Sequence, residues 1–176
     1  INILYTYKFK NLILVDIFII SFGFILRVVS GAVGTDLDIS EWLISLTFFL
    51  SLLLIIGKRF AEYSLIEDKS REVLQKYNQE FLKNSIIIVS TLILNTYLIY
   101  SIGFGNFQGN INLAFLSNIP VIFSLLRYNF LISTNSNNIE DPSKLLLKDK
   151  YILFSVISWA VIIFLSFLIS WIKNFL

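Results

Sequence analysis

The sequence changes from an uncharged apolar run to a dense group of charges within residues 42–62, WLISLTFFLSLLLIIGKRFAE. The run from Trp42 to Gly57 has no ionisable side chain, which is typical of a helix in lipid. Lys58, Arg59 and Glu62 then follow within about one helical turn. Charges placed at the edge of a membrane span favour contact with a polyanion, such as a metal-bound diphosphate, beside an apolar substrate. We therefore expect an enzyme site at the lipid boundary.

The composition of the whole chain is that of an integral membrane protein. Of its 176 residues, 56% are hydrophobic and 17 are Phe, and the mean hydropathy is +0.77. A soluble domain of this length could not cover so much apolar surface. The chain has no Cys and no His, which excludes thiolate nucleophiles, Cys/His zinc sites and histidine general bases within it. The net charge of +2 gives no support for a nucleic-acid partner.

Five apolar stretches predict membrane helices, so the expected fold class is all-α, an integral membrane helix bundle. The second and fourth stretches are short for a span of about 20 residues, and we expect both to continue as helix beyond the hydrocarbon. A re-entrant fourth segment is the alternative. We expect a single membrane-embedded domain, residues 1–176. Because the chain begins at Ile1 and contains no Met, we expect it to be processed or part of a longer protein. The five stretches are Leu12–Gly34, Trp42–Ile56, Ser85–Phe104, Ile111–Leu126 and Tyr151–Ile172.

The basic residues favour one side of these spans. Connections 35–41 and 105–110 contain no Lys or Arg, whereas connections 58–84 and 127–150 carry most of the basic residues. By the positive-inside rule, the N-terminus and both long loops are expected to be cytoplasmic. Charge pairs four residues apart predict an amphipathic surface helix over 62–83. Asp141-Pro142 predicts the start of a short helix that runs to Lys148.

Two charges lie inside the first span. Asp16 and Arg27 are eleven residues apart, about three helical turns, so they share a face about 16 Å apart. An Arg near the bilayer centre costs about 2.5–3.5 kcal/mol, which favours a phosphate or cavity contact, with a purely structural ion pair as the alternative. Asp16 fits a substrate contact or a contact with the helix dipole equally well. Gly23 and Gly31 favour close packing of another helix over ligand contact.

The other charged groups have two interpretations each. Lys58 and Arg59 could only set the topology, but their density with Glu62, and with Arg71 on the following helix, favours binding. Arg127-Tyr128 fits either a phosphate contact or an ordinary interfacial pair. Asp149-Lys150 fits an N-terminal cap better than a substrate contact.

The order and spacing of these elements resemble the UbiA superfamily of intramembrane prenyltransferases, and within it the decaprenyl-phosphate phosphoribosyltransferase branch. The family fold is a bundle of nine membrane helices, and this chain resembles the last five. The resemblance implies that the catalytic residues and the main Asp-rich metal motif lie upstream. Phe9, where Leu is expected, and Lys150, where Arg is more usual, depart from the pattern. The resemblance rests on Tyr5–Lys10, Asp16, Gly23–Arg27, Gly31-Ala32, Ser40–Trp42, Gly57–Glu62, Arg71, Leu74, Tyr77, Leu126–Tyr128, Asp141-Pro142 and Asp149-Lys150.

The resemblance implies transfer of a 5-phosphoribosyl group from phosphoribosyl diphosphate to a polyprenyl phosphate at the cytoplasmic membrane face. Mg²⁺ would be the cofactor that neutralises the diphosphate, with Glu62 as its candidate ligand or as a residue that orients the neighbouring cations. This chain by itself would be inactive, and an oligomer is compatible with the sequence. The candidate substrate-binding residues are Lys10, Asp16, Arg27, Lys58, Arg59, Glu62, Arg71, Tyr77, Arg127 and Tyr128.

Three other functions stay open at this point. The nearest is a UbiA-type enzyme that moves a prenyl group from a prenyl diphosphate to an aromatic or lipid acceptor. A transporter half is less favoured because the polar residues gather at one face rather than at mid-membrane. A non-catalytic membrane scaffold is the third.

Overall fold

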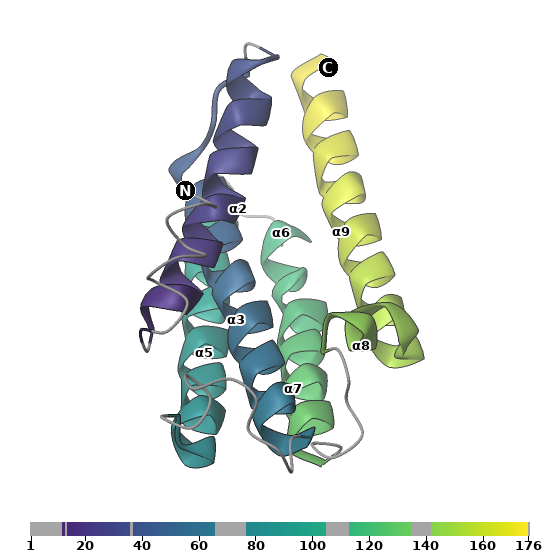
Figure 1. Ribbon diagram of the computed structural model, residues 1–176. Helices are drawn as coiled ribbons and strands as arrows, with labels where there is room; N and C mark the ends of the chain where they lie inside the picture. The colour runs from purple at the N-terminus through teal and green to yellow at the C-terminus, as the bar shows by residue number, and fades with distance from the viewer. Residues whose placement is uncertain are drawn as a thin grey trace.

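The computed structural model describes residues 12, 14–35, 37–65, 77–104, 113–134 and 142–175, and every element that it describes is helical. Five helical stretches, with α6 and α7 counted together, are long and apolar enough to cross a membrane. The predicted all-α membrane fold with five spans is confirmed. The elements are α2 (Val15–Val33), α3 (Glu41–Leu65), α5 (Gln79–Phe104), α6 (Leu113–Leu116), α7 (Asn118–Thr134), α8 (Pro142–Lys148) and α9 (Lys150–Phe175) (Figure 1).

The two short spans are extended as helix, as expected. α3 continues past Ile56 to Leu65, so Lys58, Arg59 and Glu62 lie on the helix itself. α7 continues past Leu126 to Thr134, and α6 and α7 together are long enough to cross, which favours a span over a re-entrant segment. The short helix expected to end at Lys148 is confirmed as α8. Of the amphipathic surface helix expected over 62–83, residues 62–65 end α3 and residues 79–83 begin α5, while residues 66–76 lie outside the described residues.

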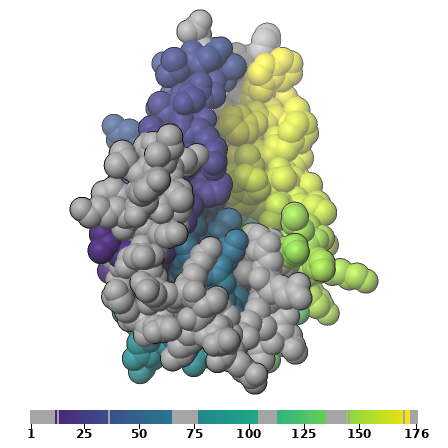
Figure 2. Space-filling view, in the orientation of Figure 1, coloured from purple at the N-terminus to yellow at the C-terminus, as the bar shows by residue number. Residues whose placement is uncertain are grey.

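The long helices pack in chain order as a row. α2 packs on α3, α3 on α5, α5 on α7, and α7 on α9, while α8 contacts both α3 and α9. α2 and α9 are therefore the two ends of the row, and Figure 2 shows them as separate columns, purple to blue and yellow. Among the large apolar side chains described in these two helices, only Ile17 and Ile152 are buried, which suits contact with lipid or with other helices rather than with water.

The fourth span is broken at Ser117, between α6 and α7. Pro120 has no N–H to donate to the carbonyl of Leu116, so the helical ladder cannot continue through this point. Side chains replace part of the ladder: the Ser117 hydroxyl donates to the Ala114 carbonyl, and the Asn118 amide donates to the Phe115 carbonyl. The break therefore places Asn118 and Ser117 inside the bundle, where both are buried.

The buried core lies toward one end of the bundle, where α2, α5 and α9 begin and α3 and α7 end. We call this the charged end, defined by Asp16, Arg59, Glu62, Tyr77, Arg127 and Asp149. Apolar residues from five helices meet there, beside the buried Asp16 and Arg59. These core residues include Ile17, Leu53, Ile56, Phe60, Leu82, Ile86, Tyr128, Ile132 and Ile152.

Gly57 is required where α3 meets α7 in this core. The hydroxyl of the buried Tyr128 lies in the space that a Cβ at position 57 would occupy, with Ile132 close behind it. In contrast, a Cβ at Gly23 or Gly31 would meet nothing within 4 Å among the described residues. The close helix packing favoured for that pair of glycines is therefore not made by the described part of the chain, whereas Gly57 makes such a contact.

We expect Gly57→Ala to lower the free energy of unfolding by about 1–3 kcal/mol, because the new methyl group overlaps the Tyr128 hydroxyl. Tyr128→Phe in the same chain should recover part of that loss. Chemical unfolding in detergent measures both changes. Gly23→Ala, also inside a helix but facing open space, is the matched control and should not destabilise. Equal losses in the two glycine variants would contradict the packing argument.

Candidate functional site

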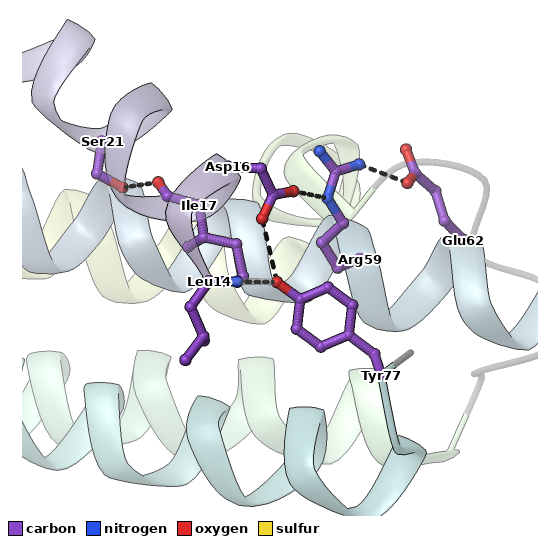
Figure 3. Close-up of polar contacts among 7 residues, drawn as sticks. All are labelled: Leu14, Asp16, Ile17, Ser21, Arg59, Glu62 and Tyr77. Carbon is purple, nitrogen blue, oxygen red and sulfur yellow. Dashed lines mark hydrogen bonds and ion pairs between the residues drawn. The ribbon is translucent and has the colours of Figure 1, made fainter. Parts of the chain in front are cut away.

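Arg59 is the central residue of the charged end. It lies on α3 and is only 6% exposed, although an ionised guanidinium is costly to remove from water. Its Nε donates to Asp16 Oδ2 at 3.0 Å, and its Nη1 donates to Glu62 Oε2 at 2.6 Å (Figure 3). Two carboxylates from two helices therefore fix the plane of one guanidinium, in contacts of the strong, charge-assisted kind.

Asp16 lies in the first turn of α2 and is 1% exposed. An acidic side chain at a helix N-terminus interacts favourably with the helix dipole, which suits an Asp at this position. Its second oxygen, Oδ1, accepts from the Tyr77 hydroxyl at 3.0 Å. Both of its oxygens are thus occupied by groups that come from outside α2, which explains how a carboxylate can be buried at this point.

Tyr77 joins the segment before α5 to the start of α2. Its hydroxyl donates to Asp16 and also accepts the Leu14 backbone N–H at 2.7 Å (Figure 3). Burial is the main cause that raises the pKa of Tyr77 to about 12, and the adjacent Asp16 charge adds to the rise. Leu14 has φ 66°, a backbone angle that L-residues rarely adopt, so the Tyr77 contact holds a strained turn immediately before α2.

Glu62 differs from Asp16 in its surroundings. It follows Arg59 by three residues on α3, and its side chain is 21% exposed. Arg59 is therefore a cation held between two carboxylates, Asp16 and Glu62, and not part of an open basic patch. Lys58, next to Arg59 in sequence, is exposed and adds a positive charge at the same end.

The structure therefore brings together four of the residues singled out in the sequence: Asp16, Arg59, Glu62 and Tyr77. Arg27 is not among them. It is exposed further along α2, and its guanidinium lies over the Phe24 ring at 5.1 Å from the ring centre, a cation–π contact within its own helix. Lys10 and Arg71 lie outside the described residues.

Arg127 and Asp149 form a second ion pair at the charged end. Arg127 Nη2 lies 2.9 Å from Asp149 Oδ2, and its guanidinium also stacks over the Tyr151 ring at 4.9 Å. Asp149 Oδ1 accepts the backbone N–H groups of Tyr151 and Ile152. The expected N-terminal cap on the fifth span is confirmed, and the same carboxylate ties α7 to α9. Tyr128, adjacent to Arg127, points instead into the core against Gly57.

An apolar cavity of about 530 Å³ occupies the other half of the bundle. α3, α5, α7 and α9 all contribute to its wall, and aromatic side chains are prominent: Trp42, Tyr97, Tyr100 and Trp159. The Trp159 indole N–H donates to the Tyr97 hydroxyl, which also hydrogen-bonds the buried Ser117. Sequence reasoning missed this aromatic wall, because Tyr97 and Trp159 lie on different spans and their pairing has no local signal.

The chain can offer a metal ion only a few ligands in the part that the structure describes. No group of three or more Asp or Glu side chains comes together there. Glu62 fits as a single carboxylate ligand, since Mg²⁺ is commonly held by one or two carboxylates together with substrate phosphates. Its contact with Arg59 would have to open for that role.

No family model matches the chain, whereas individual proteins do. It is 25% identical over 166 residues to a decaprenyl-phosphate phosphoribosyltransferase of Corynebacterium glutamicum, covering 92% of this chain and 49% of that protein. Proteins of the same name from Mycolicibacterium smegmatis (25% over 171 residues, 90% and 52%) and Mycobacterium tuberculosis (24% over 158 residues, 88% and 51%) match similarly. The resemblance drawn from the sequence is confirmed. The chain spans about half the length of these curated relatives, in agreement with the expected half of the family fold.

We expect Asp16→Asn to lower the free energy of unfolding by about 3–5 kcal/mol, because it leaves the buried Arg59 charge without its buried counterion. Thermal unfolding in detergent measures the change. Asp38→Asn is the matched control, since Asp38 is exposed, and it should have little effect. Similar losses in both variants would show that the ion pair does not organise this end of the bundle.

The Arg127 side chain holds the pKa of Asp149 below its ordinary value near 3.8. A lowered pKa means that the folded state favours the ionised form, so the pair stabilises the fold above about pH 4 and ceases to do so as the pH falls through the folded-state value. Asp149→Asn, which can still cap α9, should therefore unfold more easily than the parent at pH 7. The difference should shrink as the pH falls below about 4 in acid unfolding curves, and a constant difference would contradict the charge pairing.

Proposed function

We propose that this chain forms the substrate-binding half of a membrane transferase that moves a 5-phosphoribosyl group from phosphoribosyl diphosphate to decaprenyl phosphate. Similarity over about nine-tenths of the chain to proteins named for that activity supports the proposal. The structural observation that carries it is Arg59. Its guanidinium is buried and held in one orientation by Asp16, on a helix whose other half lines an apolar cavity.

The two parts of α3 are spaced for an amphiphilic substrate. Leu50 is the cavity-lining residue of α3 nearest to Arg59, and nine residues of helix separate them by about 14 Å. An isoprenoid tail in the cavity would therefore place its phosphate toward the charged end. Arg59 and the exposed Lys58 would bind the phosphates there, the guanidinium with its fork of donors and the ammonium as a point charge.

In the proposed reaction, the bond between C1 of the ribose and the diphosphate breaks, and an oxygen of the polyprenyl phosphate bonds to C1. The diphosphate leaves with the bonding electron pair, so negative charge builds on it as the bond breaks. Fixed cationic donors stabilise such charge without having to reorganise. Mg²⁺, when bound, would neutralise the same leaving group, with Glu62 as the ligand that this chain supplies.

The charged end would face the cytoplasm. Connections 58–84 and 127–150 both leave the bundle at this end, and they carry most of the Lys and Arg residues. By the positive-inside rule, such loops stay on the cytoplasmic side, where phosphoribosyl diphosphate would be available to a membrane enzyme.

The test uses the complete protein that contains this chain, with radiolabelled phosphoribosyl diphosphate, decaprenyl phosphate and Mg²⁺. We expect labelled lipid from the parent and about a 10- to 100-fold lower kcat/KM in Lys58→Ala, since hydrogen bonds to charged groups contribute about 1.5–3 kcal/mol. Lys83→Ala, an exposed lysine at the start of α5, is the matched control and should retain activity.

Other outcomes would reject the proposal. Turnover of a prenyl diphosphate with an aromatic or lipid acceptor, and no labelled phosphoribosyl lipid, would favour the prenyltransferase alternative. Substrate flux into liposomes without chemistry would favour a transporter. Unimpaired function after combined Lys58→Ala and Arg59→Ala would favour a scaffold.

A further inference from the structure

The two carboxylates that hold Arg59 are not equivalent. Asp16 is 1% exposed and its second oxygen is held by Tyr77, so its position is fixed from outside α2. Glu62 is 21% exposed and lies on the same helix as Arg59, close to the last residue of α3, Leu65. Figure 3 shows the two acids approaching the guanidinium from different sides, Asp16 at Nε and Glu62 at Nη1.

Charge decides what happens when an anion approaches this arrangement. Asp16 and Glu62 both lie against the guanidinium, so each of their negative charges repels a phosphate that approaches Arg59. The repulsion falls if one carboxylate leaves. Glu62 is the more exposed of the two and can rotate toward solvent, whereas Asp16 is buried and would also have to give up its hydrogen bond with Tyr77.

We propose that Glu62 is a displaceable counterion: an incoming diphosphate or phosphate group replaces its carboxylate at Arg59 Nη1, while Asp16 keeps hold of Nε. Glu62 is then a residue that sets anion affinity, and Asp16 and Tyr77 are positioning residues that keep the guanidinium aimed. The exchange deepens the transferase function proposed above and rests on it for the identity of the natural anion. The released carboxylate becomes available to a divalent cation that accompanies the anion.

Inorganic pyrophosphate without added divalent metal is the probe, because it separates competition for Arg59 from any metal ligation. In titration calorimetry on the complete protein in detergent, Glu62→Gln should bind pyrophosphate about two- to fivefold more tightly than the parent. That range corresponds to losing a partly exposed ion pair of about 0.4–1 kcal/mol. Asp16→Asn should bind pyrophosphate more weakly than the parent.

Glu80→Gln is the matched control. It removes one negative charge from an exposed residue in the first turn of α5, at the same end of the bundle, so it reports any general electrostatic effect. Added Mg²⁺ should reduce the gain seen in Glu62→Gln, because the parent alone can then use its freed carboxylate on the metal. A glutamate with a purely structural role would not give this metal dependence.

Equal or weaker pyrophosphate binding in Glu62→Gln than in Glu80→Gln would overturn the exchange, and so would undetectable binding in both the parent and Glu62→Gln. These outcomes are separate from failure of the transferase function. Tighter binding in Glu62→Gln with no phosphoribosyl transfer by the parent would retain the exchange and reject the donor. Transfer by the parent without tighter binding in Glu62→Gln would retain the phosphoribosyl donor and reject the exchange.

Discussion

The ion pair between Arg59 and Asp16 is the constraint on which the charged end depends. Removing both charges from water is expensive, and their attraction alone does not reliably offset that penalty. Here the Tyr77 hydroxyl and the Glu62 carboxylate supply further hydrogen bonds. One pair thereby fixes three segments relative to one another: the start of α2, the end of α3 and the approach to α5. We infer that its main contribution is a defined geometry rather than stability.

The rest of the bundle follows a division into two regions. Toward the charged end, apolar residues and ion pairs lie side by side. Arg127 and Asp149 form a second ion pair there, between α7 and α9. In the other half, hydrogen bonds join Tyr97, Ser117 and Trp159 behind an apolar cavity. Lipid cannot supply missing hydrogen bonds, so each region has to pair its polar atoms internally. α3 therefore contacts the apolar cavity in its first half and carries the charged residues Arg59 and Glu62 near its end.

The sequence predicted the features that are local. The lengths of the apolar stretches predict the five spans, and the change from apolar to charged residues at Lys58 predicts the charged end. The interpretation of Asp149 as an N-terminal cap is also confirmed. The sequence could not supply partners that are distant in the chain. The shared face of Asp16 and Arg27 is a property of one helix, yet the partner of Asp16 is Arg59, 43 residues away on another helix. Arg127 and Asp149 are likewise 22 residues apart, and their pairing depends on how α7 crosses α9.

Lys58 and Arg59 are adjacent in sequence, but burial separates their physical roles. An exposed ammonium attracts anions at long range and can follow a moving phosphate on its flexible stem. A buried guanidinium with one edge fixed by Asp16 cannot follow, and it offers a donor geometry that an anion must match. A pair of cations divided in this way suits a site that must first collect a highly charged donor and then hold it in one orientation beside a lipid phosphate. Two equally exposed cations would provide only the first of these functions.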